Sequence, residues 1–258
     1  MAKVDLSQAV SSNLLTLQRT SSLIGVTQTR LSTGLKVNSA IDDAAAFFTA
    51  KALGNNAKDF DALKSNIDLA ISTIQAAIDG IDAISELVNQ AKGLASNAKA
   101  TGNTNERSTL AVQFNELLGQ IDTIANDSSF NGTNLLQATP DNLAVEFNTD
   151  NTSNLTITGL DSTTASTGIN LAAATNNFTD VAAIDTALTA ISAALTSLRS
   201  NASTLGSRNT ILATRLDFTE NLVNTLEGGE GKLTLADLNA ESANLLALQT
   251  RQQLGINS

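Results

Sequence analysis

The sequence has no cysteine, histidine, tryptophan or tyrosine, and a single proline in 258 residues. Without cysteine the chain has no disulfide framework, no thiolate metal site and no cysteine nucleophile. Without histidine it lacks the most frequent general base and metal ligand among side chains. The single proline, Pro140, leaves almost nothing that would interrupt long helices. These absences disfavour an enzyme or a metalloprotein and favour a helical structure.

Basic residues are also few, since 15 lysines and arginines stand against 25 acidic residues, a net charge of −10. They are scattered and form no patch, which argues against a nucleic-acid partner because such binding depends on neutralising phosphates. No run approaches the length of about 18 apolar residues that spans a bilayer, so we expect no membrane insertion. Residues 1–8 lack the apolar core of a cleaved signal peptide, so any export would use another route.

Apolar residues at helical spacing are what the sequence has in abundance. One stripe with steps of three or four residues runs through 60–95, and a second runs through 181–226 with only Asn209 and Thr219 interrupting it. A shorter stripe occupies 110–124. This spacing is typical of long helices that pack along one seam, as in coiled coils. The stripes therefore predict a bundle in which they form the core.

The two ends of the chain, 1–36 and 235–256, carry similar stripes but very few charges. Such helices are marginal in isolation, because helices in proteins take most of their stability from packing. We expect both ends to be disordered or frayed in the monomer and to become helical when neighbouring copies cover them. This predicts an assembly subunit. The residues expected to form its assembly interface are Leu14, Leu17, Ile24, Leu31, Leu35, Leu245, Leu248 and Leu254.

Two breaks in the periodicity divide the chain. The first lies at 34–43, where Ser39, Asp42 and Asp43 are candidate N-caps for the helix that follows. The second is the glycine-rich stretch 228–232, which predicts the end of a helix. We therefore expect a discontinuous domain of terminal helices and a bundle domain, with the boundaries 1–40 plus 232–258 and 41–231.

The insert at about 126–178 has a different character. Asn131-Gly132 is a strong signal for a tight turn. Alternation of apolar with mainly polar residues over 143–147 and 155–158 predicts two or three short strands that lie against the bundle. The stretch 161–180, rich in Ser, Thr, Asn and Ala, predicts a solvated loop. The expected fold is mainly α: a long helical bundle or coiled coil formed by the N- and C-terminal segments, with a small β-hairpin insert.

The sequence offers no catalytic, cofactor-binding or metal site. Asp42 and Asp43 are adjacent carboxylates, but neighbouring residues of a helix do not face each other, so capping and interaction with the helix dipole explain them better. The stretch 228–232 lacks both the spacing and the preceding strand of a phosphate-binding loop. The Asn-x-Ser/Thr sequons are expected by chance in a chain so rich in these residues. We therefore expect no enzyme.

Three stretches resemble the signatures of bacterial flagellin. Residues 29–40 together with 42–45 are similar to the N-terminal signature of that family. Phe130-Asn131-Gly132 ahead of Leu135-Leu136 resembles the turn after the family's second long helix. Residues 241–255 are similar to its C-terminal signature. These matches occur in the family's order and cover about 1–137 and 184–258, whereas the insert is short and matches weakly.

The resemblance implies a structural subunit of the flagellar filament that self-assembles for motility. It implies as partners further copies of the chain, the flagellar export chaperone, the export apparatus and the filament cap. It also implies an extracellular protein exported without a cleaved signal peptide, whose terminal helices form an inner tube and which lacks the variable outer domains of longer flagellins. The alternatives are a hook–filament junction protein and a secreted adhesin whose insert binds a surface ligand.

Two departures from the family pattern carry expectations of their own. The resemblance places an innate-receptor epitope near 89–97, in the region of Gln90, Lys92, Leu94 and Asn97. Leu94 is kept, but Gln90 stands where the family has an arginine, so we predict weak recognition by that receptor. Family members also continue for several helical turns beyond the stretch that ends here at Ser258, and the resemblance places those turns in the inner tube and in the region bound by the chaperone.

Overall fold

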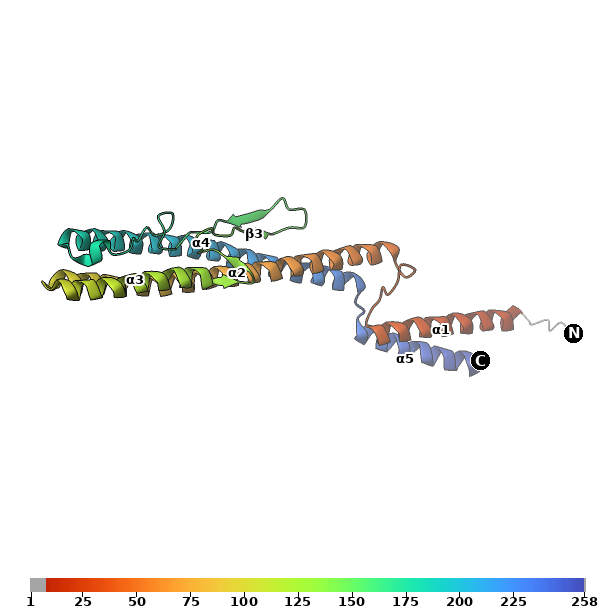
Figure 1. Ribbon diagram of the computed structural model, residues 1–258. Helices are drawn as coiled ribbons and strands as arrows, with labels where there is room; N and C mark the ends of the chain where they lie inside the picture. The colour runs from red at the N-terminus through yellow and green to blue at the C-terminus, as the bar shows by residue number, and fades with distance from the viewer. Residues whose placement is uncertain (1–7, 258) are drawn as a thin grey trace. The chain divides into compact units, whose positions relative to one another are not determined.

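The structure, a computed structural model, describes residues 8–257 and is mainly helical (Figure 1). The elements, in chain order, are α1 (Gln8–Thr33), α2 (Ala44–Ala100), α3 (Thr104–Asp127), β1 (Ser129–Phe130), β2 (Thr133–Asn134), β3 (Leu143–Glu146), β4 (Asn154–Ile157), the 3₁₀-helix η1 (Thr175–Phe178), α4 (Val181–Thr234) and α5 (Leu238–Asn257). The expected fold class, a long helical bundle with a small β-hairpin insert, is confirmed.

The chain divides into two compact units. We call Met1–Lys58 with Leu222–Ser258 the terminal unit, and Asp59–Asn221 the bundle unit. The sequence predicts other boundaries, 1–40 with 232–258 for one domain and 41–231 for the other. Those boundaries lie at breaks in the hydrophobic periodicity and stay a prediction.

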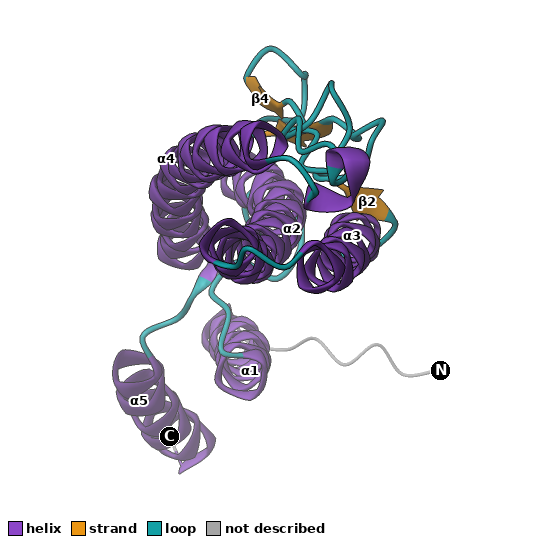
Figure 2. Cartoon of the chain, turned by 60° about the vertical axis from the view of Figure 1, so that its left-hand side comes forward, coloured by secondary structure: helices purple, strands orange, loops and turns teal. Residues whose placement is uncertain are grey.

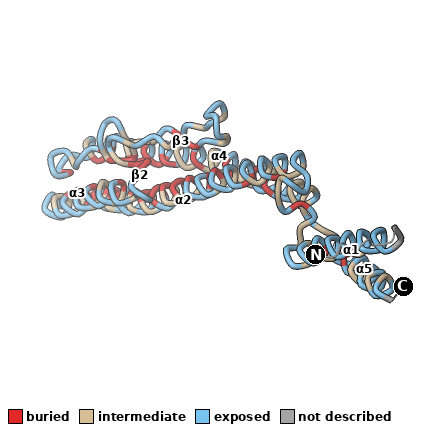
Figure 3. The backbone as a smooth tube through the Cα atoms, turned by 90° about the vertical axis from the view of Figure 1, so that its right-hand side faces the viewer, coloured by how far each residue is buried: buried red, intermediate tan, exposed pale blue. Residues whose placement is uncertain are grey.

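The core of the bundle unit lies along a seam between long helices. Figures 2 and 3 show α2, α3 and the start of α4 running side by side there, with buried residues concentrated on their facing sides. Buried residues of α2 follow one another at alternating steps of three and four: Ile67, Ala70, Ile74, Ala77, Ile81, Ile84, Val88, Ala91, Ala95 and Ala98. On α4 they repeat every seven residues: Ile184, Ile191, Leu198, Leu205 and Leu212. The seams predicted from periodicity are therefore confirmed as core over 67–98 and 184–212, whereas Val181 at the start of the second seam is exposed.

Among residues 8–257, one helix, α4, is apolar enough to cross a membrane by length and composition alone. An 18-residue window of α4 has a mean hydropathy of 1.6, and 28% of that window is buried in the protein. Ile184, Ile191 and Leu198 of this helix are buried in the core, which is the pattern of a bundle helix. The expectation that the chain does not insert into a membrane stays a prediction.

The insert forms two antiparallel strand pairs, four strands where two or three are expected, and β3 and β4 lie in the stretches where alternation predicts strands. β1 and β2 are joined by Asn131 and Gly132, which have φ of 50° and 80° and so supply the left-handed backbone of a tight hairpin turn. β3 pairs with β4, placing Val145 opposite Leu155. Val145 and Ile157 are buried, so the hairpin is anchored on the bundle.

The prediction of a solvated loop over 161–180 is wrong. Ile169, Leu171 and Phe178 are buried in the bundle core, and the ring of Phe178 lies 5.2 Å from that of Phe114 on α3, edge to face. The polar residues find partners at short range. Asp122 on α3 accepts hydrogen bonds from the backbone N–H (2.7 Å) and hydroxyl (2.9 Å) of Thr164. Such bonds to a helix far away in sequence satisfy the polar groups of the segment and let it pack, which composition alone did not reveal.

The glycine-rich stretch 228–232 does not end its helix, because α4 continues to Thr234. Each glycine inside a helix costs about 1 kcal/mol relative to alanine. Close packing within the terminal unit offsets that cost. A Cβ atom on Gly54 of α2 would lie 2.6 Å from Oε2 of Glu230, and one on Gly229 would lie 3.3 Å from Leu53. Glycine on both helices therefore permits a close approach that a side chain would obstruct.

One buried polar atom in the seam of α4 has no hydrogen-bond partner among the protein atoms of the described residues: Oδ1 of Asn209. A buried acceptor left unsatisfied costs about 1–3 kcal/mol. We therefore expect Asn209→Leu to raise the free energy of unfolding by about that amount, measured by denaturant unfolding followed by circular dichroism. Thr219→Val is the matched control, because the buried Thr219 hydroxyl already donates to the Arg215 carbonyl. Loss of stability in Asn209→Leu would contradict the prediction.

Candidate assembly interface

α1 and α5 lie side by side in the terminal unit (Figure 1). The fully buried residues of this pair are polar: Thr20, Thr27 and Glu241. The apolar residues between the helices are only half-buried, as a pair of helices cannot enclose a core. A Cβ atom on Gly255 of α5 would lie 2.9 Å from a methyl group of Leu17, which places this end of α5 against α1. The pair thus covers one stripe and leaves most of its surface exposed.

The structure separates the residues expected in the assembly interface into three groups. Those half-buried on the helices are Leu17, Ile24, Leu31, Leu245 and Leu248. Leu35 lies beyond α1 in the connecting segment, where it pairs with Leu235 in an antiparallel bridge. Leu14 and Leu254 are exposed. Their contacts with neighbouring copies, and the expected fraying of both ends in the monomer, stay predictions.

A second apolar stripe on α1 was missed from the sequence. Leu15, Leu23 and Val26 are exposed, and their spacing of eight and three residues places them on one face of the helix. The sequence pattern held a signal for this stripe, but the stripe through Leu17, Ile24 and Leu31 has the more regular spacing. On α5 the exposed apolar residues include Leu246, Leu254 and Ile256. We call Leu15, Leu23, Val26, Leu246 and Leu254 the exposed stripe.

The segments that connect the terminal helices to α2 and α4 are held by local bonds. Asp43 caps α2, since its Oδ1 accepts the N–H of Ala46 at 3.0 Å. Asp42 accepts the N–H of Ser39 (2.9 Å) and of Asn38 (3.1 Å), and these bonds lower the pKa of the Asp42 carboxyl. The expected capping role is confirmed for Asp43, whereas Asp42 bonds to the preceding connecting segment and not to α2. In the described part of the chain, no group of three or more acidic, histidine or cysteine side chains is placed to hold a metal ion.

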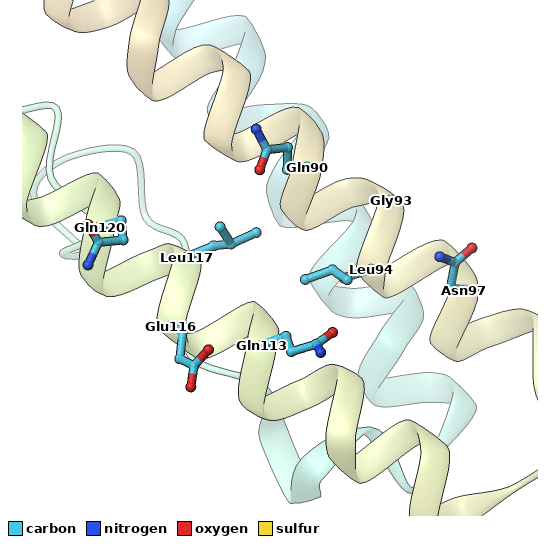
Figure 4. Close-up of a pocket in the computed structure, with 8 residues that line it drawn as sticks. All are labelled: Gln90, Gly93, Leu94, Asn97, Gln113, Glu116, Leu117 and Gln120. Atoms are coloured by element: carbon cyan, nitrogen blue, oxygen red, sulfur yellow. The ribbon is translucent and has the colours of Figure 1, made fainter.

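The residues expected in the innate-receptor epitope lie on α2 in the bundle unit. Gln90, Leu94 and Asn97 line a groove of about 680 Å³ between α2 and α3 (Figure 4). Leu94 points across it toward Leu117 of α3. Lys92 is exposed but does not line the groove. The structure thus brings three of the expected residues together and leaves Lys92 apart. Their role in receptor recognition stays a prediction.

Comparison with known proteins gives matches over most of the chain. The family model of the bacterial flagellin N-terminal helical region matches residues 5–141, and that of the C-terminal helical region matches residues 188–258. Flagellin FljO of Caulobacter vibrioides is 34% identical to this chain. The match covers 94% of this chain and 88% of FljO. A flagellin of Brucella melitensis is 29% identical and covers 100% of this chain and 94% of its own.

A solved structure shares the fold. The crystal structure of Bacillus cereus flagellin aligns with a TM-score of 0.53 and 23% identity, over 60% of this chain and 88% of that one. At this identity the similarity concerns the architecture of the helices.

Proposed function

The chain belongs to the bacterial flagellin family, and from this premise we propose that it is a structural subunit of the flagellar filament whose copies join through the exposed stripe of α1 and α5. The observation that carries the proposal is the stripe itself, whose apolar side chains are 42–66% exposed on helices with few charges. Apolar surface of this kind marks an interaction site in a soluble protein. A second copy of the same chain offers a matching surface.

The two alternatives have less support. A secreted adhesin would present its insert as a free binding surface, but Val145, Ile157 and Leu171 of the insert are buried against the bundle. A hook–filament junction protein would share the terminal helices, yet two relatives that match over 94% and 100% of this chain carry the name flagellin. A filament subunit therefore accounts best for the whole chain.

The family implies an extracellular polymer of many copies. We propose in addition that the chain leaves the cell through the flagellar export apparatus without a cleaved signal peptide, aided by an export chaperone and polymerising under the filament cap. Exposed leucines such as Leu246 and Leu254 support the need for a chaperone, because they would associate prematurely in water. No catalytic activity is proposed.

Immunogold electron microscopy of intact source cells, with antibody against this chain, tests the function directly. Gold along the length of external filaments is the expected result. Label confined to one spot at the base of each filament would indicate a junction protein. Diffuse label over the cell surface would favour an adhesin.

Weak recognition by the innate receptor is a separate prediction. Gln90 lines the α2–α3 groove next to Leu94, and an amide there cannot form the charged hydrogen bonds of an arginine. We expect Gln90→Arg to raise potency in a reporter-cell assay by about tenfold or more, the factor that corresponds to about 1.4 kcal/mol. Lys92→Arg, outside the groove, is the control and is expected to change little. Full potency of the unmodified chain would contradict the prediction.

A further inference from the structure

Two points of contact hold α1 and α5 together at the ends where their connecting segments meet. At the first, Gly34 (φ 73°) ends α1, and its N–H donates to the Arg30 carbonyl at 2.8 Å. The N–H of Lys36 then donates to the Thr234 carbonyl (2.7 Å), and that of Ala236 donates to the Gly34 carbonyl (2.9 Å). This backbone bridge joins the connecting segments at a single place.

The second point is an ion pair between the helices. Nη1 of Arg30, in the last turn of α1, lies 2.9 Å from Oε1 of Glu241, in the first turn of α5. The Glu241 side chain is only 11% exposed and that of Arg30 is 38% exposed. Among residues 8–257, this is the only ion pair between α1 and α5. A carboxylate buried to this degree is strongly destabilising if its cation is removed.

The backbone bridge holds the connecting segments, but the apolar contacts farther along the helix pair do not by themselves select one alignment. Leu17, Ile24 and Leu31 repeat every seven residues, so α1 presents nearly the same apolar surface after a shift of two helical turns. A shift of even one turn, about 5.4 Å, would separate Glu241 from Arg30. Arg251 lines the same groove of about 380 Å³ as Arg30 and Glu241, but among residues 8–257 it forms no ion pair. The alignment with Arg30 beside Glu241 is therefore the one in which the buried carboxylate is paired.

We propose that Arg30 and Glu241 are positioning residues for polymerisation, which fix the register of α1 against α5. The proposal rests on the filament function proposed above. Each copy carries exposed apolar residues on both helices, with Leu23 and Val26 on α1 and Leu246 on α5. A slip between the helices would displace the residues of α1 relative to those of α5, so neighbouring copies would no longer match both helices.

An exchange of charges tests the proposal in the full chain. The single variants Arg30→Glu and Glu241→Arg are each expected to lower the yield of filaments at least about tenfold, a change that corresponds to about 1.4 kcal/mol. The reason is that each variant places two like charges next to each other. The double variant Arg30→Glu/Glu241→Arg restores the pair with opposite polarity and is expected to restore filaments. Thermal unfolding of the bundle unit controls for general loss of folding.

Register itself is read by cross-linking, since the chain has no native cysteine. Leu17→Cys with Gly255→Cys places two thiols where α5 contacts α1, and a disulfide is expected to form in the otherwise unchanged chain. Its yield should fall in each single charge variant and return in the exchange. Normal filaments in either single variant, or no recovery in the exchange, would overturn the proposal. The unmodified chain could fail to polymerise while the disulfide yield still falls in the single charge variants and returns in the exchange. That result would contradict the filament function but would support the role of Arg30 and Glu241 in fixing the register.

Discussion

Replacing Ile74 by alanine is expected to lower the free energy of unfolding of the bundle unit by about 2–5 kcal/mol. Ile74 is 0% exposed and lies in the middle of the α2 seam. The substitution removes apolar contacts and leaves a cavity that the surrounding helices fill only in part. Neighbours at steps of three and four along α2 are also buried, so the seam has little freedom to collapse locally.

Denaturant unfolding followed by far-ultraviolet circular dichroism measures this effect, because the chain has no tryptophan or tyrosine to report by fluorescence. Ile211→Ala is the matched control: the same change on α4 at an exposed position, expected to alter stability by less than about 0.5 kcal/mol. Equal losses at the two positions would show that the seam through Ile74 is not the core of the unit.

The elements that the sequence predicted correctly are those whose signal is local and repeated. The seam of α2 is visible because burial recurs at steps of three and four over many turns, so an error at one position does not obscure it. The same holds for β3 and β4, where apolar and mainly polar residues alternate along each strand, and for the β1–β2 hairpin, where Asn131-Gly132 is a local turn signal. In each case the residues near one another in sequence carry the information needed.

The errors arose where distant partners decide the structure. Local propensity at 228–232 predicts a helix end, but α4 continues to Thr234 and Glu230 lies close to Gly54 of α2. The segment 161–180 has the composition of a solvated loop, yet Asp122 and Phe114 on α3 hold it against the bundle. Composition reports neither contact, because each joins residues far apart in the chain.

The same limit applies to the assembly interface. Leucine spacing indicated that α1 and α5 are amphipathic, and it located Leu17, Ile24 and Leu31 on the face that meets a partner helix. It did not show that this face is already occupied by α5 within one copy. The exposed stripe is therefore the surface that we propose for contacts with other copies. Nor did it pair Arg30 with Glu241, since no local pattern links two charges at opposite ends of a chain.

Replacing Leu246 by aspartate is expected to abolish filament formation while leaving the unfolding of the bundle unit unchanged. Leu246 is 66% exposed on α5, so a carboxylate there remains hydrated in the single copy. Polymerisation would bury that charge in an apolar interface without a partner, which is far more costly than burying leucine. Because every copy carries the change, we expect the critical concentration for polymerisation to rise at least about a hundredfold, corresponding to about 2.7 kcal/mol per added subunit.

Two variants separate the effect of position from the effect of charge. Leu246→Met keeps an apolar side chain of similar volume and is expected to polymerise. Val112→Asp introduces the same charge at an exposed apolar position of α3 in the bundle unit and is also expected to polymerise. Sedimentation and electron microscopy measure the polymer in each case. Filaments from Leu246→Asp at the normal concentration would remove α5 from the proposed interface. Loss of filaments in Val112→Asp alone would place the contacts between copies on the bundle unit.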